Sequence, residues 1–243
     1  MTGERSLRIW EIDFLRGLAI VLMVGYHLLY DLGDFVGLEK FLGFTTDLTT
    51  PAWQVAQHFF AGLFVILSGV SSNFSHNNYR RSLKYLAVAM VITVATYFFD
   101  PESAILFGII HCLGVSALVY GLFFTKSGAM TCLVTGIIIA GLSLLLPQAH
   151  RILHIDSNWL LPLGLHRPDF ASFDYFPLIP WLGIFLVGAG LGRLTYASRK
   201  SLFSRELRPT FFNWCGRHSL WIYLLHQPVI LAILYLLGYA KLS

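Results

Sequence analysis

Charged side chains are scarce in this sequence of 243 residues. Only 12% of the residues are Asp, Glu, Lys or Arg, while 56% are hydrophobic, and an ordinary soluble domain carries about 25% charged residues. The composition does not suit a surface that faces water. The hydrophobic residues occur in long runs separated by short charged connections, which is typical of membrane-spanning helices. We therefore expect an integral membrane protein.

Cysteines are also few, and their spacing excludes two kinds of site. Cys112, Cys132 and Cys215 lie in or beside hydrophobic runs without C-x-x-C spacing, so neither a disulfide framework nor a zinc site is indicated. No metal is expected. The sequence has no internal repeat and no low-complexity linker, so we expect one domain over residues 1–243. Nucleic-acid motifs are missing too, so we expect membrane lipids rather than nucleic acid as partners, and homo-oligomers stay open.

Seven hydrophobic segments are long enough, or nearly so, to cross a bilayer, which takes about 20 apolar residues in a helix. The third is among the shortest. The predicted fold class is therefore all-α, a polytopic transmembrane helical bundle of about seven spans in a cell membrane, such as a bacterial inner membrane. The segments comprise residues 12–32, 53–72, 82–99, 104–124, 129–146, 177–194 and 216–237.

The basic residues predict the orientation of the bundle. Lys and Arg collect on the cytoplasmic side of membrane proteins. With seven spans, all but four of the 17 basic residues fall on the side of the N-terminus, which predicts a cytoplasmic N-terminus and an outer C-terminus. The N-terminal side holds Arg5, Arg8, Arg16, Arg80, Arg81, Lys84, Lys126, Arg193, Arg199, Lys200, Arg205, Arg208 and Arg217, and the other side holds Lys40, Arg151, Arg167 and Lys241.

The first predicted span carries a stripe of titratable side chains. Each residue of a helix turns by about 100°, so Asp13, Arg16, His27 and Asp31 share one face. A charge near the centre of a bilayer costs at least about 2.5 to 3.5 kcal/mol, so this face should point into the bundle. Asp13 and Arg16 either pair with each other at the inner interface or bind a ligand. His27 lies deeper, with Asp31 four residues on and within reach to orient its imidazole, which favours a functional histidine.

Other predicted spans carry histidines at a similar depth. His58 follows Gln54 and Gln57, His111 lies between two glycines, and His226 shares a helical face with Ser219 and Tyr223. A single intramembrane histidine is often only a hydrogen-bonding residue between helices. We expect His27, His111 and His226 to converge on one cavity open to the outer side.

Three blocks of this sequence resemble the heparan-alpha-glucosaminide N-acetyltransferase catalytic-domain family of small prokaryotic membrane proteins. They are R-I-W-E-I-D-F-L-R-G-L-A-I-V-L-M-V-G-Y-H from Arg8 to His27, F-G-I-I-H-C-L-G from Phe107 to Gly114, and D-Y-F-P-L-I-P-W-L-G from Asp174 to Gly183. The first block and S-L-W-I-Y-L-L-H-Q-P from Ser219 to Pro228 are also similar to the wider membrane acyltransferases, in which an Asp, an Arg and a later catalytic His would map onto Asp13, Arg16 and His27.

The resemblance implies transfer of an acyl group, expected to be acetyl, from cytosolic acetyl-CoA to a hydroxyl or amine acceptor such as a sugar or lipid-linked glycan. A histidine can take the proton of the acceptor or carry the acyl group itself. The candidate catalytic residues are His27, Asp31, His111 and His226. The candidate residues for binding the coenzyme donor are Asp13, Arg16, Ser68 and Arg193.

Two other functions stay open at the level of the sequence. Intramembrane Asp, Arg and His residues also mark ion pathways, so a proton-coupled transporter is an alternative, although inverted repeats typical of transporters are not detectable. A non-catalytic membrane protein that binds a partner is the second alternative. It predicts that Asp13, Arg16 and His27 satisfy one another without a cavity nearby.

Overall fold

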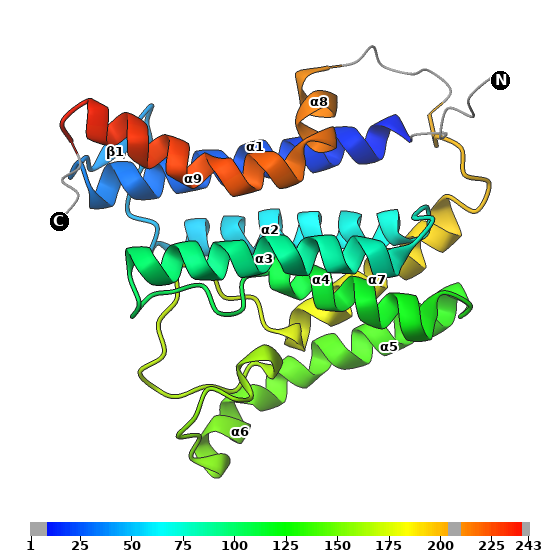
Figure 1. Cartoon of the computed structure of the whole chain (residues 1–243). Coiled ribbons are helices and arrows are strands. Elements are labelled where there is room, and N and C mark those ends of the chain that lie inside the picture. The colour runs from blue at the N-terminus through cyan, green and yellow to red at the C-terminus, as the bar shows by residue number, and fades with distance from the viewer. Residues whose placement is uncertain (1–8, 204–209, 240–243) are drawn as a thin grey trace. The chain divides into compact units, whose positions relative to one another are not determined.

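A computed structural model describes residues 9–203 and 210–239, and these residues are mainly helical (Figure 1). The long helices are α1 (Trp10–Asp34), α2 (Pro51–Ser72), α3 (Asn78–Phe99), α7 (Leu178–Thr195) and α9 (Ser219–Leu236). Helix α5 (Ala129–Gly141) continues through η2 (Leu142–Leu145) into α6 (Leu146–Leu153), and α4 (Ile109–Val119) continues as η1 (Tyr120–Phe124). Shorter elements are η3 (Leu161–Leu163), α8 (Phe211–Arg217) and a hairpin of β1 (Lys40–Phe41) and β2 (Phe44–Thr45).

Six helical stretches among the described residues are long and apolar enough to cross a membrane, which confirms the all-α polytopic fold. They include the third predicted segment, whose helix α3 has 22 residues. The fifth extends beyond the predicted residue 146 to Leu153. The fourth helix is shorter than predicted, because Ala104 to Gly108 precede it. The backbone of this stretch pairs with another connection: Phe173 N–H donates to Ser103 O at 2.9 Å, and Phe176 N–H donates to Phe107 O at 3.0 Å. Ile109–Phe124 is thus an apolar helix shorter than 18 residues.

The chain forms two compact units. The first comprises the described residues of Met1–Phe64 and Phe203–Ser243, and the second is Val65–Leu202. Helix α2 begins in the first unit and ends in the second.

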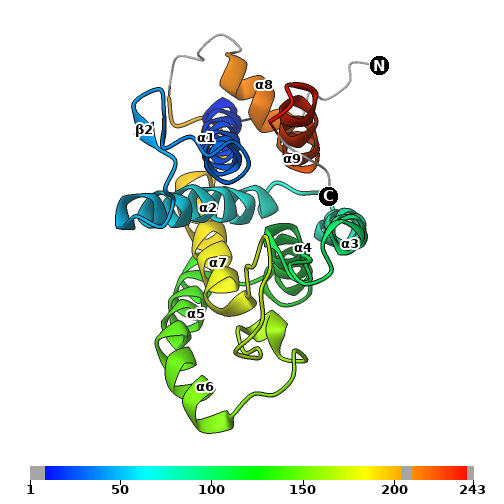
Figure 2. The same cartoon turned by 90° about the vertical axis from the view of Figure 1, so that its left-hand side faces the viewer.

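In the first unit, α1 packs against α8 and α9 (Figures 1 and 2). The approach of α1 to α8 requires two glycines. A Cβ atom at Gly17 would collide with the carbonyl oxygen of Phe212, and one at Gly216 would collide with the carbonyl oxygen of Asp13. Small residues of this kind let helix backbones approach closely within a membrane. At the other end of α1, Leu32 packs against Ile230 and Leu234 of α9.

In the second unit, α7 packs closely against α5, and α3 packs against α4. The C-terminal part of α2 also touches α7, since a Cβ atom at Gly69 would collide with the carbonyl oxygen of Phe185. Small residues at this contact let the backbones of α2 and α7 approach closely. Phe185, Leu186 and Tyr120 are almost completely buried here.

Many large hydrophobic side chains face outward, particularly on α3 and α5. Met90, Val94, Phe98, Met130 and Ile137 are all more than half exposed, which suits contact with lipid and not with water. The chain is therefore a multi-pass membrane protein. The predicted cytoplasmic N-terminus stays a prediction, and five residues used for it, Arg5, Arg8, Arg205, Arg208 and Lys241, lie outside the described residues.

Candidate active site

Two histidines of the first unit face each other across α1 and α9. The ring centroids of His27 and His226 are 4.9 Å apart, and the two rings are nearly perpendicular at 77°. Both side chains are partly buried. The tyrosine before His27, Tyr26, contacts its ring edge to face at 5.8 Å. The predicted approach of His27 and His226 is therefore present in the structure.

The backbone sets the protonation pattern of these two rings. His27 Nδ1 lies 2.9 Å from the carbonyl oxygen of Met23, and His226 Nδ1 lies 2.6 Å from that of Tyr223. A carbonyl oxygen only accepts, so each neutral ring carries its proton on Nδ1 and leaves Nε2 as a base. His226 Nε2 is buried and has no hydrogen-bond partner among the described residues. The pair thus offers two basic nitrogens that the fold itself does not use for hydrogen bonding.

Asp31 has a different partner from the one that its spacing predicts. Its carboxylate is fully buried and accepts two bonds from Gln227 Nε2, at 3.0 Å and 3.1 Å. The expected orientation of His27 by Asp31 is therefore wrong in this geometry, because the ring of His27 bonds the carbonyl of Met23 instead. Gln227 is the neighbour of His226, so Asp31 fixes α9 beside α1 and acts on the histidine pair only through the backbone.

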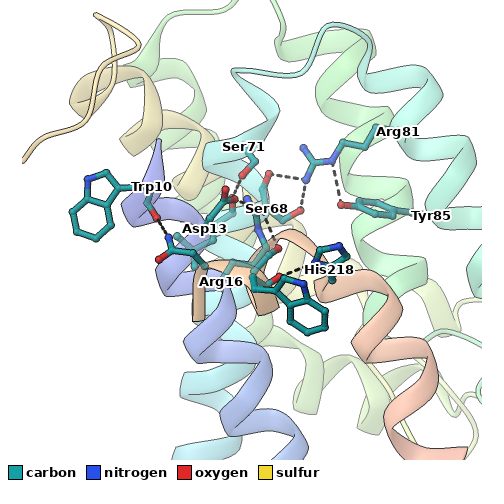
Figure 3. Close-up of polar contacts among 12 residues, drawn as sticks. Trp10, Asp13, Arg16, Ser68, Ser71, Arg81, Tyr85 and His218 are labelled. Carbon is teal, nitrogen blue, oxygen red and sulfur yellow. Dashed lines mark hydrogen bonds and ion pairs between the residues drawn. The ribbon is translucent and has the colours of Figure 1, made fainter. Parts of the chain in front are cut away.

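Asp13 and Arg16 form an ion pair at the other end of α1, where Figure 3 shows them close together. Arg16 NH1 lies 3.2 Å from Asp13 Oδ1, and the two side chains retain 20% and 17% exposure. The same nitrogen lies 3.5 Å from the carbonyl oxygen of Gly216 in α8. Nearby, Asn213 of α8 donates to the carbonyl oxygen of Trp10 at 2.8 Å. The pair therefore sits at the packed junction of α1 and α8.

His111 belongs to the second unit and holds the start of α4. Its Nδ1 accepts from Gly108 N–H at 3.2 Å. Its Nε2 lies 3.1 Å from the hydroxyl of Thr93, which itself donates to Ile105 O at 2.6 Å, so Nε2–H is the donor. Both ring nitrogens are occupied, and only 7% of the residue is exposed. This geometry favours a structural role for His111 over the predicted catalytic one.

Asp174, which opens the third block that resembles the family, completes the start of α4. Its Oδ2 accepts from Ile109 N–H at 2.9 Å. A carboxylate at this position satisfies one of the free N–H groups at a helix start. The connection that carries it is anchored by Tyr175, whose hydroxyl donates to Leu161 O at 2.8 Å. Burial raises the pKa of Tyr175 to about 12, so this anchor stays neutral at physiological pH.

Arg193 holds several helices of the second unit together. Its NH2 donates to the hydroxyl of Tyr120 at 2.8 Å and to the carbonyl oxygens of Phe124 and Thr125 at 2.6 Å and 3.0 Å. Its Nε donates to Asn73 Oδ1 at 3.1 Å. These bonds close the end of η1, where helix carbonyls lack internal partners. They give Arg193 a structural role, and its predicted binding of a coenzyme stays a prediction.

Ser68 lies beside an arginine that the candidate residues did not include. Arg81 of α3 reaches the hydroxyl of Ser68 with NH2 at 2.7 Å, as Figure 3 shows. The signal was present in the sequence, since Arg81 belongs to the basic run of Arg80, Arg81 and Lys84 at the start of a hydrophobic segment. The positive-inside rule, however, explains such a run without any binding site. The three-dimensional partner is what distinguishes Arg81 from its neighbours.

Comparison with known families identifies a family that matches most of the chain. The family model described as "Heparan-alpha-glucosaminide N-acetyltransferase, catalytic" matches residues 8–228, which is most of the chain. This range includes α1, with its ion pair and His27, and extends to His226 and Gln227 of α9. No curated protein and no solved structure matches.

Proposed function

The chain belongs to the heparan-alpha-glucosaminide N-acetyltransferase catalytic family, and we propose that it is a membrane acetyltransferase that uses His27 to move an acetyl group from acetyl-CoA to a hydroxyl or amine. The observation that carries this proposal is the histidine pair. The ring centroids of His27 and His226 are 4.9 Å apart. Each ring bonds a backbone carbonyl oxygen through Nδ1, and these two bonds leave both Nε2 atoms available.

The pair supplies the base that acyl transfer requires. As the oxygen or nitrogen of the acceptor attacks the thioester carbonyl, His27 Nε2 takes its proton. The carbon–sulfur bond then breaks, and the departing thiolate recovers the proton as coenzyme A. Base catalysis of this kind contributes about 10²- to 10⁴-fold to a rate. The bond from Nδ1 to Met23 O holds the ring in one tautomer and stabilises the imidazolium that forms.

His226 supports His27 in this scheme. Its Nε2 accepts a bond from the acceptor group or from protonated His27, which relieves a buried polar atom that otherwise lacks a partner. Arg16 and Asp13, at the opposite end of α1, hold the coenzyme end of the donor, with Arg16 as the phosphate ligand. Asp31 positions α9 through Gln227.

Labelled acetyl-CoA tests the activity. Purified protein in detergent or nanodiscs should consume [¹⁴C]acetyl-CoA when amino sugars or glycans are supplied as acceptors. Absence of consumption with every acceptor and of hydrolysis without one contradicts the proposal. Incorporation of free coenzyme A, labelled in its adenosine part, into unlabelled acetyl-CoA without an acceptor separates two forms of the mechanism. Incorporation shows that a histidine carries the acetyl group, and its absence shows direct transfer.

Proton-coupled transport is the second candidate, favoured by the buried carboxylate of Asp31. An intramembrane Asp whose carboxylate bonds neutral Gln227, and no other side chain in the described part of the chain, can gain and lose a proton during a transport cycle. This function predicts proton uptake into proteoliposomes, driven by a solute gradient and without coenzyme A. Asp31→Asn would abolish this uptake, whereas acetyl transfer needs only the helix contact that Asn preserves in part.

A further inference from the structure

Arg81 is surrounded by oxygen atoms that carry no charge. Its NH2 donates to the hydroxyl and the carbonyl oxygen of Ser68 at 2.7 Å and 3.1 Å, and its NH1 donates to Ser72 Oγ at 2.9 Å. Its Nε donates to the hydroxyl of Tyr85 at 3.3 Å, and the guanidinium lies 5.3 Å from the centre of that ring. All of these residues belong to the second unit.

The positive charge of Arg81 is therefore not neutralised by a side chain of the chain's described part. No ion pair of Arg81 is found among the described residues, whereas Arg16 pairs with Asp13 and Arg167 with Asp169. Arg81 is only partly exposed, and Ser68 and Ser72 beneath it are 5% and 2% exposed. A guanidinium withdrawn from water and bound only to neutral groups gains strongly from an anion.

Donors for an anion are available in this cluster. A guanidinium has five N–H groups, and the four bonds above leave a second NH1 hydrogen. The hydroxyl of Ser68 accepts from Arg81, while Ser72 donates to the carbonyl oxygen of Ser68 at 3.1 Å and not to its hydroxyl. The proton of the Ser68 hydroxyl thus has no acceptor in the contacts found among the described residues. A forked guanidinium beside a hydroxyl donor suits the oxygens of a phosphate group.

We propose that Arg81, with Ser68 and Ser72, is a phosphate-binding site. It rests on the proposed function where the phosphate is that of coenzyme A, and it adds Arg81 to the residues that hold the donor. The other source of the same chemistry is the phosphate of an anionic lipid headgroup. The competing explanation is that Arg81 has only a structural role, since its bonds to Ser68 and Ser72 also join α3 to α2.

Arg80 provides a matched control. It is the neighbour of Arg81 in sequence and carries the same charge, but its side chain is exposed. Arg81→Gln and Arg80→Gln therefore change the net charge equally, but only Arg81→Gln removes the contacts with Ser68 and Ser72. Arg81→Lys keeps the charge without the fork. Binding of coenzyme A, dephospho-coenzyme A and pantetheine to the full chain in nanodiscs is then measured for each variant and the original protein.

The site predicts a specific pattern of affinities. Arg81→Gln should weaken the binding of coenzyme A by about 10- to 100-fold, which corresponds to the loss of a charge-assisted contact. The affinity of Arg81→Lys for coenzyme A should fall between those of the original protein and Arg81→Gln. Arg80→Gln should change this affinity by less than about twofold. Pantetheine, which has no diphosphate, should bind all variants alike. A smaller loss with dephospho-coenzyme A assigns the 3′-phosphate to Arg81. If Arg81→Gln does not fold, the Arg81→Lys comparison decides.

A lipid arm separates the second source. Native mass spectrometry measures retained phosphatidylglycerol against diacylglycerol, which lacks the phosphate. Loss of phosphatidylglycerol in Arg81→Gln but not in Arg80→Gln, with unchanged coenzyme A affinity, supports a lipid phosphate at the site. Equal behaviour of the two variants in both arms overturns the site. If the original protein binds no coenzyme A, the proposed function fails, while the lipid arm still decides on Arg81.

Discussion

His27 and His226 obtain their chemical character from backbone carbonyls of their own helices. Each ring bonds a carbonyl three or four residues earlier through Nδ1, which a helix offers without help from distant residues. The contact fixes the tautomer and directs Nε2 away from the helix backbone. His58 has the same local contact, with Nδ1 2.8 Å from Gln54 O, but its side chain is exposed. The close pairing with a second histidine is therefore what distinguishes His27.

His111 differs from this pair, and its replacement should affect stability more than chemistry. His111→Ala leaves the amide of Gly108 without its acceptor and Thr93 without its donor, at a cost of about 1 to 3 kcal/mol. We expect a lower melting temperature in detergent and a nearly normal rate of acetyl transfer per folded molecule. His58→Ala is the control. Loss of transfer with unchanged melting would restore His111 as a catalytic residue.

The sequence predicts the faces of these side chains better than their partners. Helical spacing places His27 on the inward face of α1, and the structure agrees. The same spacing suggests that Asp31 orients His27, whereas Asp31 bonds Gln227, which is 196 residues away in the chain. Spacing along one helix reports only neighbours on that helix, and contacts with another helix depend on packing that the pattern does not contain.

At the scale of elements, the junction of α1 and α8 depends on glycine. Gly17→Ala should destabilise the protein by about 1 to 3 kcal/mol, because the new methyl group collides with the carbonyl oxygen of Phe212. Gly25 lies on the same helix, and a Cβ there meets nothing within 4 Å. Gly25→Ala should therefore be neutral, or stabilising by up to about 1 kcal/mol. Thermal unfolding followed by circular dichroism compares the two.

An equal effect of both substitutions would contradict the close packing of α1 against α8. The cause would then be a general property of glycine in α1, such as helix flexibility, and not the distance between the two backbones. Expression of each variant in membranes, measured before purification, ensures that the comparison includes molecules that fail to fold.

Hydrophobicity predicts the existence of the spans well, but it predicts their first and last residues less accurately. Six of the seven predicted segments lie in helices long enough to cross a membrane. The fourth begins five residues late, at Ile109 and not at residue 104. Ala104 and Ile105 are as buried as a helix core, so hydrophobicity alone includes them. Their connection is held by the hydroxyls of Thr93 and Ser172, which donate to the carbonyl oxygens of Ile105 and Ala104.

At the scale of the whole molecule, the basic residues predict which connections face the cytoplasm. A cysteine in place of Glu39 should react with a membrane-impermeant maleimide on intact cells. One in place of His76 should react only after the membrane is opened. Both positions are exposed in the structure, and native Cys112, Cys132 and Cys215 are buried, so background labelling should be low. Labelling of both positions in intact cells would contradict the prediction that the two connections lie on opposite sides of the membrane.

The central claim is that His27 is the base for acetyl transfer, and one rate comparison tests it most directly. Acetyl-CoA consumption in a single turnover is measured for the original protein, His27→Gln and His58→Gln. His58 makes the same contact with its own helix as His27. We predict a loss of about 10²- to 10⁴-fold for His27→Gln and a change of less than about twofold for His58→Gln. Equal rates for the original protein and a folded His27→Gln variant would contradict the account.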